Sequence, residues 1–491
     1  MPSSVPTAPA IPAGEPLVIR SAADVARAVA HHATPRRGAA MVVLLAFGGV
    51  FMDAYDFSSI AFGITEIKRQ FGLSGTMTGV VNAAIMVGAA LGALSGGVLV
   101  DRIGRYRLFM ADMVFFVVAA IGCALAPDVW TLIVFRFLMG IGVGLDMPVA
   151  MAFLAEFSSL RGRGNRSQRV NGWSPAWYAA TGFGYLVVLV LFLALPDSSQ
   201  AHLWRYVVGF GAVPALVVLV VRRRYLKESP QWLAGQGDLR GAADILRSTY
   251  GIDAELAPDV AATSSRPSLR SRRAALTRLW SPQYRVRTLA ALAIAVFSTF
   301  GYNAVAYGTP LIIANLFHQG ELTTIVSSLV INIGFGVVGG LLGVALVSRA
   351  GARSLTLVGF GLQTASLVVL AVIGVPTGAV LGIAVIMLAV FIFAQAGGPG
   401  ATQMAYATLS YPTSLRGTGV GFTEGTKRLF SVVSLFFFPI LATSMGSGVF
   451  WLIAIFPLLG FLSLAVIRWD PTGVDTDAED FAGSERLEPA R

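Results

Sequence analysis

Residues 97–107 read Gly97-Val98-Leu99-Val100-Asp101-Arg102-Ile103-Gly104-Arg105-Tyr106-Arg107, a charged stretch set between two long apolar runs. The flanking runs, 76–99 and 108–125, have about the length of roughly 20 residues that a helix needs to cross a bilayer. Neither run alternates apolar and polar residues as a β-strand of a membrane barrel would. This part of the sequence therefore predicts two membrane-spanning helices joined by a short basic turn.

The composition of the whole chain agrees with a membrane protein. Of 491 residues, 55% are hydrophobic and 13% are charged, whereas soluble proteins carry roughly 25% charged residues. The net charge of +10 alone would suggest a nucleic-acid partner, but the basic residues lie between apolar runs, so we expect none. A single cysteine and four scattered histidines exclude a disulfide framework and a metal site rich in Cys or His.

Apolar runs long enough to cross the membrane recur along the chain. The predicted spans are 41–64, 76–99, 108–125, 130–154, 170–195, 204–221, 288–314, 323–347, 355–374, 378–404, 419–442 and 448–467. The first run is not a signal peptide, because it begins forty residues into the chain and contains two aspartates. We therefore expect an all-α polytopic membrane protein with twelve transmembrane helices.

The basic residues predict the orientation of these helices. With the N-terminus in the cytoplasm, the inner segments hold 30 Lys and Arg residues and the outer loops hold two, Lys68 and Arg69. Such an imbalance is typical of cytoplasmic loops. We therefore expect a protein of the cell membrane whose two termini are both cytoplasmic.

The spans group into two halves. A six-helix bundle is predicted over 41–221 and a second over 288–467, joined by a basic cytoplasmic linker, 222–287. The linker is interpreted as a solvated, partly helical connection, with a regulatory or lipid-binding element as the alternative. The flanking tails, 1–40 and 468–491, have compositions typical of disorder.

A weak internal repeat supports two related halves. Residues 160–164 match residues 415–419 at an offset of 255, and residues 101–105 match residues 348–352 at an offset of 247. Parallel repeats of this kind are an architecture of transporters. The repeat therefore favours a carrier over a channel or a membrane enzyme.

The chain resembles the major facilitator superfamily over residues 40–468, most clearly at 97–107. The helix-4 stretch 136–144, Ala155-Glu156 and the stretch 227–233 are similar to the sugar porter branch. The helix-1 stretch 53–56 and the glycine-rich stretch 419–428 in helix 11 are similar to the aromatic acid:proton symporters. The resemblance implies the major facilitator fold, with two pseudo-symmetric bundles of six helices.

The resemblance also implies salt bridges that hold the cytoplasmic side closed in one state. The residues expected in these gating salt bridges are Asp101, Arg102, Arg105, Glu156 and Arg163.

Three charged residues inside spans are expected to couple transport to protons, because ionisable groups in a membrane are costly and mark a pathway. At about 1.5 Å per residue, Asp56 and Arg136 fall at similar depth in the outer part of the membrane, and the sugar porter resemblance implies that they pair. If the partner moves away, burial favours protonation of the carboxylate. A fixed structural ion pair is the alternative. Asp53 lies on the same helical face as Asp56, and either could carry the proton.

Arg428 lies near the middle of helix 11 and is a candidate site for a carboxylate on the substrate, because guanidinium matches carboxylate in two-point fashion. The alternative is local neutralisation by Glu424. Asp146 could line the pathway or cap a kink at Pro148. The full set of residues expected to bind substrate is Tyr55, Asp146, Trp177, Asn303, Tyr307, Gln395 and Arg428.

The sequence thus predicts a proton-coupled symporter, driven by the proton gradient without any cofactor or metal, for a small polar metabolite. An organic or aromatic acid is the main hypothesis, because Phe297-Ser298 stand where sugar porters usually carry two glutamines before Gly301-Tyr302-Asn303. A sugar or polyol symporter is the alternative. A drug antiporter and a membrane enzyme fit less well, since helix 5 lacks a glycine-rich antiporter pattern and no nucleophile with a base is present. We expect the carrier to act as a monomer.

Overall fold

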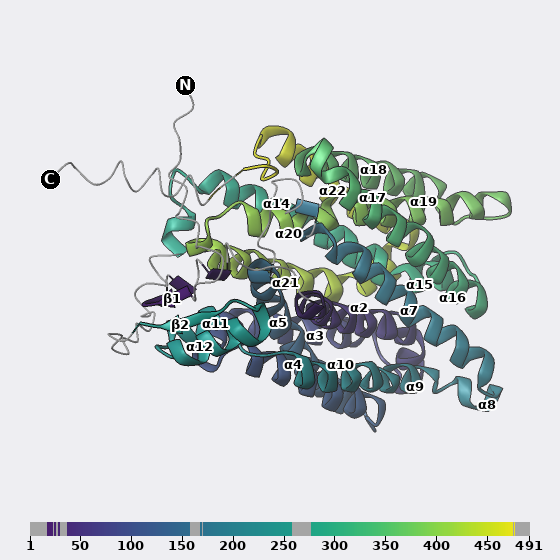
Figure 1. Ribbon diagram of the computed structural model, residues 1–491. Coiled ribbons are helices and arrows are strands. Elements are labelled where there is room, and N and C mark those ends of the chain that lie inside the picture. Colours follow the sequence, from purple (N-terminus) through teal and green to yellow (C-terminus); the bar gives the residue numbers. More distant parts are fainter. Residues whose placement is uncertain are drawn as a thin grey trace.

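The computed structural model is built almost entirely of helices (Figure 1). The residues that it describes are 17–22, 24–25, 28–29, 37–157, 167–168, 170–257, 276–474 and 476.

The N-terminal half consists of long helices that alternate in direction. They are α2 (Arg37–Phe71), α3 (Gly75–Ile103), α4 (Arg105–Ala124), α5 (Val129–Phe157) and α7 (Trp173–Ala194), followed by α9 (Leu203–Phe210) and α10 (Ala212–Tyr225), which together form the sixth span. A single turn, α8 (Asp197–Gln200), precedes α9. These helices suit a lipid environment because they are apolar and because each satisfies its backbone hydrogen bonds internally.

The C-terminal half repeats this arrangement with more interruptions. Its helices are α14 (Arg285–Tyr302), α15 (Thr309–Leu311), α16 (Glu321–Val330), α17 (Val338–Ala350), α18 (Ala352–Ile373), α19 (Ala379–Gly397), α20 (Pro399–Leu409), α21 (Thr413–Met445) and α22 (Val449–Val466). Single π-helical turns, at Asn303–Tyr307, Ile312–Leu316 and Ile331–Val337, lie within the seventh and eighth spans. Such turns are common at functional sites.

The expected number of spans is confirmed. Ten segments of the described chain are long and apolar enough to cross a membrane. The last of them, Leu415–Val466, contains two helices, α21 and α22, and the 35-residue helix α2 comes in addition. The protein is therefore a multi-pass membrane protein with the expected two bundles, in which α3, α4 and α5 lie below α17, α18 and α19 in Figure 1.

Glycines bring helices into close contact within the N-terminal half. A Cβ added at Gly88 would clash with the carbonyl oxygen of Phe137, and a Cβ at Gly140 would clash with that of Ile85. Small residues allow such close approach of membrane helices. Between the halves, α3 packs on α21, and α7 packs on α16 and on the π-helical turn after it.

The internal repeat is visible at the end of the bundle that carries Gly104, Arg222 and Gly351. We call it the inner end, because the basic residues predict that it faces the cytoplasm. Gly104 precedes α4 with φ 101° and Gly351 precedes α18 with φ 81°, a conformation that favours glycine. A carboxylate then caps each helix: Glu228 accepts from the backbone N–H of Arg105 (2.9 Å), and Asp470 accepts from that of Arg353 (3.0 Å).

Part of the N-terminal tail is ordered, contrary to expectation. Strand β1 (Leu17–Ile19) pairs in parallel with β2 (Ala254–Leu256) of the linker. The linker helices α11 (Pro230–Gly235) and α12 (Leu239–Ile245) pack beside them, at the left in Figure 1. Ile19 and Val25 are fully buried in the apolar cluster that these elements form. The prediction of disorder for 1–40 therefore does not hold for β1, because this short apolar stretch packs on apolar residues of the linker. The linker is partly helical, as expected, and its helices also pack in this cluster.

Candidate functional site

A small cavity lies between the two halves, towards the outer end. It has about 30 Å³ of space for the centre of a water molecule, which is room for roughly two waters. Pockets that hold small ligands measure roughly 300–1,000 Å³, so this cavity is contracted. Its lining comes from α2, α3, α5 and α21 and from the interrupted seventh span, and consists of Phe57, Ile60, Ala61, Ile64, Asn82, Arg136, Asn303, Tyr307, Gly308, Leu311, Leu435, Phe438 and Pro439.

Three of the residues predicted from sequence line this cavity. Arg136 is 2% exposed, and its Nε donates to the carbonyl oxygen of Val81 at 3.0 Å. Asn303 is 3% exposed and its Nδ2 has no hydrogen-bond partner. The Tyr307 ring packs on Phe57 at 4.8 Å between centroids. The cavity therefore combines a guanidinium, an amide and aromatic faces, which suits a polar ligand that also presents apolar faces.

Asp56 lies beside this cavity wall. Its carboxylate is 1% exposed, and neither oxygen has a hydrogen-bond partner. Arg136 is the cation that acts on Asp56. In the described part of the chain, no ion pair within 4 Å joins the two side chains. The predicted pair therefore interacts electrostatically without direct contact. A buried carboxylate without hydrogen bonds is costly when ionised.

Asp53 lies one helical turn nearer the inner end. It is fully buried, and both carboxylate oxygens also lack hydrogen-bond partners. The charges that act on it most are those of Asp146 and then Arg428, followed by Asp56 and Lys427. Asp53 therefore lies where the N-terminal half meets the cations of α21.

The cations of α21 differ in their partners. Lys427 Nζ binds the Glu424 carboxylate at 3.0 Å, which is the local neutralisation considered from the sequence. Arg428 is 4% exposed, and its hydrogen-bond acceptor in the described structure is the sulfur of Met86, at 3.7 Å. Thioether sulfur is a weak acceptor. Arg428 is thus a buried guanidinium whose strong donors are free for an anion.

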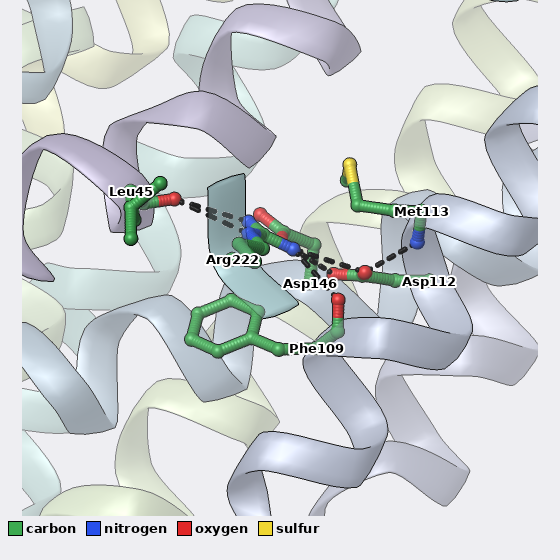
Figure 2. Close-up of polar contacts among 6 residues, drawn as sticks. All are labelled: Leu45, Phe109, Asp112, Met113, Asp146 and Arg222. Atoms are coloured by element: carbon green, nitrogen blue, oxygen red, sulfur yellow. Dashed lines mark hydrogen bonds and ion pairs between the residues drawn. The ribbon is translucent and has the colours of Figure 1, made fainter. Parts of the chain in front are cut away.

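Asp146 lies in a different environment from the one expected. Arg222, near the inner end of α10, binds Asp112 of α4 and Asp146 of α5, each at 3.0 Å, and all three side chains are fully buried (Figure 2). The guanidinium also donates to the carbonyl oxygens of Leu45 and Phe109 and lies over the Phe109 ring at 4.1 Å. We call Asp112, Asp146 and Arg222 the inner triad. Within it, Asp146 does not face the cavity, and its role in substrate binding stays a prediction.

Two other residues expected to bind substrate point into the bundles. The Tyr55 hydroxyl donates to the carbonyl oxygen of Val207 at 2.6 Å, inside the N-terminal half. Gln395 accepts from Gln363 at 2.6 Å, inside the C-terminal half. Neither lines the cavity, because each buried polar group is used to join helices of its own half.

Trp177 belongs to a set of hydrogen bonds that join the halves. Its Nε1 donates to the Tyr302 hydroxyl at 2.5 Å. Nearer the inner end, Trp173 Nε1 donates to the carbonyl oxygen of Ala401 at 3.2 Å, and Ser174 donates to that of Ala396 at 2.8 Å. These hydrogen bonds of α7 therefore join the halves, and Trp177 takes part in them without lining the cavity.

The predicted gating residues are mostly outside what the structure describes. Arg163 and the side chains of Asp101, Arg102 and Glu156 lie outside the described residues. Arg105 is described, and its guanidinium donates to the Ser229 hydroxyl at 3.3 Å. The predicted salt bridges at the inner end stay predictions.

Two residues of interest were missed by reasoning from sequence. Arg222 was assigned to the linker because Arg222-Arg223-Arg224 resembles the basic edge of a span, but α10 continues to Tyr225 and holds Arg222 inside the bundle. Asn82 is an isolated amide in an otherwise apolar run, and a polar residue in a membrane helix indicates a candidate site.

Comparison with known proteins agrees with this architecture. The family model described as "Sugar (and other) transporter" matches residues 41–469. The putative metabolite transport protein YwtG of Bacillus subtilis is 27% identical over 87% of this chain and 90% of its own length. The glucose transporter GlcP of Staphylococcus epidermidis is 26% identical over 87% of this chain and 93% of its own, and the major myo-inositol transporter IolT of Bacillus subtilis is 27% identical over 87% and 90%.

Solved structures share the fold. The proton:xylose symporter XylE of the major facilitator superfamily, bound to 6-bromo-6-deoxy-D-glucose, superposes with a TM-score of 0.72 at 19% identity, over 90% of this chain and 98% of its own. A partially occluded inward-open form of XylE from E. coli gives 0.73 at 18% identity, over 90% and 100%. The family and these relatives are transporters and not enzymes. The chain belongs to the sugar (and other) transporter family, and it is a multi-pass membrane transporter with the major facilitator fold.

Proposed function

We propose that the protein is a proton-coupled symporter that imports a small polyhydroxylated metabolite of the sugar or polyol class by alternating access. The family match and relatives named for glucose and myo-inositol support this substrate class. It was the alternative on the sequence, and it has more support than the organic acid of the main hypothesis. Asn303, free in the cavity wall, is the amide that would bind a hydroxyl group.

The observation that carries proton coupling is the state of Asp56 beside Arg136. Its carboxylate is buried without hydrogen bonds, so the ionised form depends on the nearby guanidinium. When Arg136, which lines the cavity, turns towards a ligand, Asp56 loses this support and takes a proton. When the ligand leaves, Arg136 is free to stabilise the ionised form again and the proton is released.

Alternating access accounts for the contracted cavity. Space for roughly two waters cannot hold a sugar, so the outer part of α2 must separate from α15 of the seventh span for entry. The contacts of α7 with α14, α19 and α20 must then break for exit. Asp56 and Arg136 both belong to the N-terminal half, so they stay on the same side of the substrate path during both movements.

Uptake into proteoliposomes tests this function. With an inward proton gradient, purified protein should accumulate a labelled sugar or polyol above equilibrium, and a protonophore should abolish that accumulation. The Asp56→Asn variant should lose uphill uptake and keep exchange of labelled for unlabelled substrate. Full uphill uptake by this variant would remove Asp56 as the proton carrier, and uptake that ignores the protonophore would identify a uniporter.

A second candidate, transport of an organic acid, is favoured by Arg428. Among the described residues, the hydrogen-bond acceptor of this guanidinium is a thioether, whereas its neighbour Lys427 is neutralised by Glu424. Arg428→Gln should then weaken uptake of a carboxylate at least tenfold more than uptake of a neutral sugar, since a charge-assisted bidentate contact is worth about 1.5–3 kcal/mol. Lys427→Gln is the matched control and should not discriminate. Equal loss for both substrates in Arg428→Gln would exclude an anion site there.

A further inference from the structure

The inner triad has an unequal charge count. Two carboxylates, Asp112 and Asp146, bind the one guanidinium of Arg222, and all three side chains have no exposed surface. The other partners of Arg222 are carbonyl oxygens and the Phe109 ring, which add no positive charge. With both aspartates ionised, the group would hold one uncompensated negative charge away from water, which is far costlier than a neutral group.

The groups around the triad do not supply the missing charge. Helix α4 contributes Asp112, α5 contributes Asp146 and α10 contributes Arg222. Helix α2 faces the triad with Gly49, where an added Cβ would clash with the Asp146 carboxylate, and with Asp53 one turn later. The cations Lys427 and Arg428 of α21 act on Asp53. In the described part of the chain, Arg222 is the one cation in ion-pair contact with Asp112 or Asp146.

One atom of the triad is also left without a partner. Asp146 Oδ2 is buried and accepts no hydrogen bond, although Oδ1 of the same carboxylate binds Arg222. Both oxygens of Asp112 are occupied, by Arg222 and by the backbone N–H of Met113. With both aspartates ionised, this oxygen would have no hydrogen bond to compensate for its burial, which adds to the cost of the unbalanced charge.

We infer that the inner triad is a second proton-binding site of this transporter, in which Asp112 and Asp146 hold one proton against the single charge of Arg222. That the triad binds a proton is inferred from the charge count. That this proton takes part in transport rests on the proposed function. Asp146 contacts Gly49, which precedes Asp56 by seven residues, or about 10 Å of helix. Asp53 lies between, so the triad is the inner end of a series of buried carboxylates that starts at Asp56.

A proton can pass along this series without any other reactant. The acid form of Asp56 gives its proton to the Asp53 carboxylate, and Asp53 gives it to the Asp146 carboxylate. The proton that Asp146 and Asp112 already share then passes to water at the inner end. The two transfers between aspartates leave the charge of the protein unchanged, and the release to water removes the one positive charge that Asp56 gained when it was protonated.

Infrared spectroscopy of the purified protein in liposomes tests the site directly, because a protonated carboxyl group has a C=O stretch that an ionised one lacks. We expect this band at neutral pH in the Asp53→Asn/Asp56→Asn double variant, where the triad is intact. Asp146→Asn and Asp112→Asn, each added to that double variant, should remove it. Asp128→Asn, a replacement of an exposed aspartate on the outer side, is the matched control and should leave it in place.

The outcomes separate this site from the proposed function. Absence of the band in the double variant, or its persistence in both triad variants, would overturn the inference whether or not transport is proton-coupled. If the triad variants fail to fold, labelling of the double variant with ¹³C-aspartate still decides, because it shifts the band of a protonated aspartate and leaves that of a buried glutamate such as Glu66 in place. If the band behaves as expected and uptake ignores a protonophore, the proton site stands and the symport proposal fails.

Discussion

Each half of the transporter uses one arginine to tie its third helix to its sixth, and the two halves do it differently. In the N-terminal half, Arg222 of α10 binds two buried carboxylates, Asp112 and Asp146. In the C-terminal half, Arg353 of α18 is partly buried and donates to backbone carbonyl oxygens at the end of α22, among them Leu464 at 2.8 Å. One tie depends on ionisation and the other does not. Of these two ties, the one in the N-terminal half is therefore the one whose strength depends on the protonation of its partners.

The same division extends towards the middle of the membrane. The buried carboxylates without hydrogen bonds, Asp53 and Asp56, are in the N-terminal half. The C-terminal half contributes Lys427 and Arg428 and the free amide of Asn303. We infer that protons bind mainly to one half while the other half supplies most of the contacts that orient a polar substrate.

The largest expected effect is that of removing the cation from the inner triad. Arg222→Met leaves two buried carboxylates without a partner, and breaking a buried ion pair in this way costs about 3–5 kcal/mol. Arg353→Met loses hydrogen bonds to carbonyls that can turn to water, so we expect about 1–2 kcal/mol. Thermal unfolding of both variants in detergent measures the difference.

A rescue variant sharpens this comparison. Arg222→Met combined with Asp112→Asn and Asp146→Asn removes all charge from the triad and should recover most of the lost stability, because neutral polar groups can pair with one another. A triple variant as unstable as Arg222→Met alone would contradict the role of charge. Equal losses in Arg222→Met and Arg353→Met would remove the distinction between the halves.

A smaller and more equal effect is expected where the halves are alike. Glu228 caps α4 and Asp470 caps α18, each by accepting from backbone N–H groups of the first turn. Loss of a helix cap costs about 1 kcal/mol, so Glu228→Ala and Asp470→Ala should lower the unfolding temperature by similar amounts. Glu228→Gln and Asp470→Asn keep an acceptor and should lose less. A large excess for one half would show that the capping carboxylate has a further partner.

The sequence predicted the fold well because membrane helices are specified by long apolar runs, which leave little choice of structure. It also predicted that Asp53, Asp56, Arg136 and Arg428 are buried, since charges inside such runs stand out. It failed at Arg222, because the end of a span is uncertain by a few residues and basic residues normally mark that end.

Sequence reasoning was weakest for neutral polar residues. Tyr55 and Asn303 are equally conspicuous in apolar runs, yet Tyr55 bonds Val207 within its own half and Asn303 faces the cavity. The face of a helix that meets the opposite half depends on how both bundles pack, and the sequence of one helix does not determine that packing. The N-terminal strand β1 was missed for a similar reason, because its partner β2 lies more than two hundred residues away.

The smallest expected effect concerns the outer ends of α5 and α19, the fourth helix of each half. Asp128 precedes α5 and accepts from the backbone N–H of Trp130 (2.8 Å) and from Thr131, and these hydrogen bonds lower the pKa of its exposed carboxyl. Helix α19 instead follows Gly378 and has no side-chain cap. Because the pKa of Asp128 is lower in the folded protein, its stabilising contribution is present above the unfolded value of about 3.9 and is lost as pH falls through the folded value.

Asp128→Asn should therefore unfold within roughly 1 °C of the parent at pH 7, and the difference should vanish under strongly acidic conditions. A deficit that is the same at both pH values would mean that Asp128 acts through its shape and not its charge, and that the outer ends of the two halves do not differ in their response to protons.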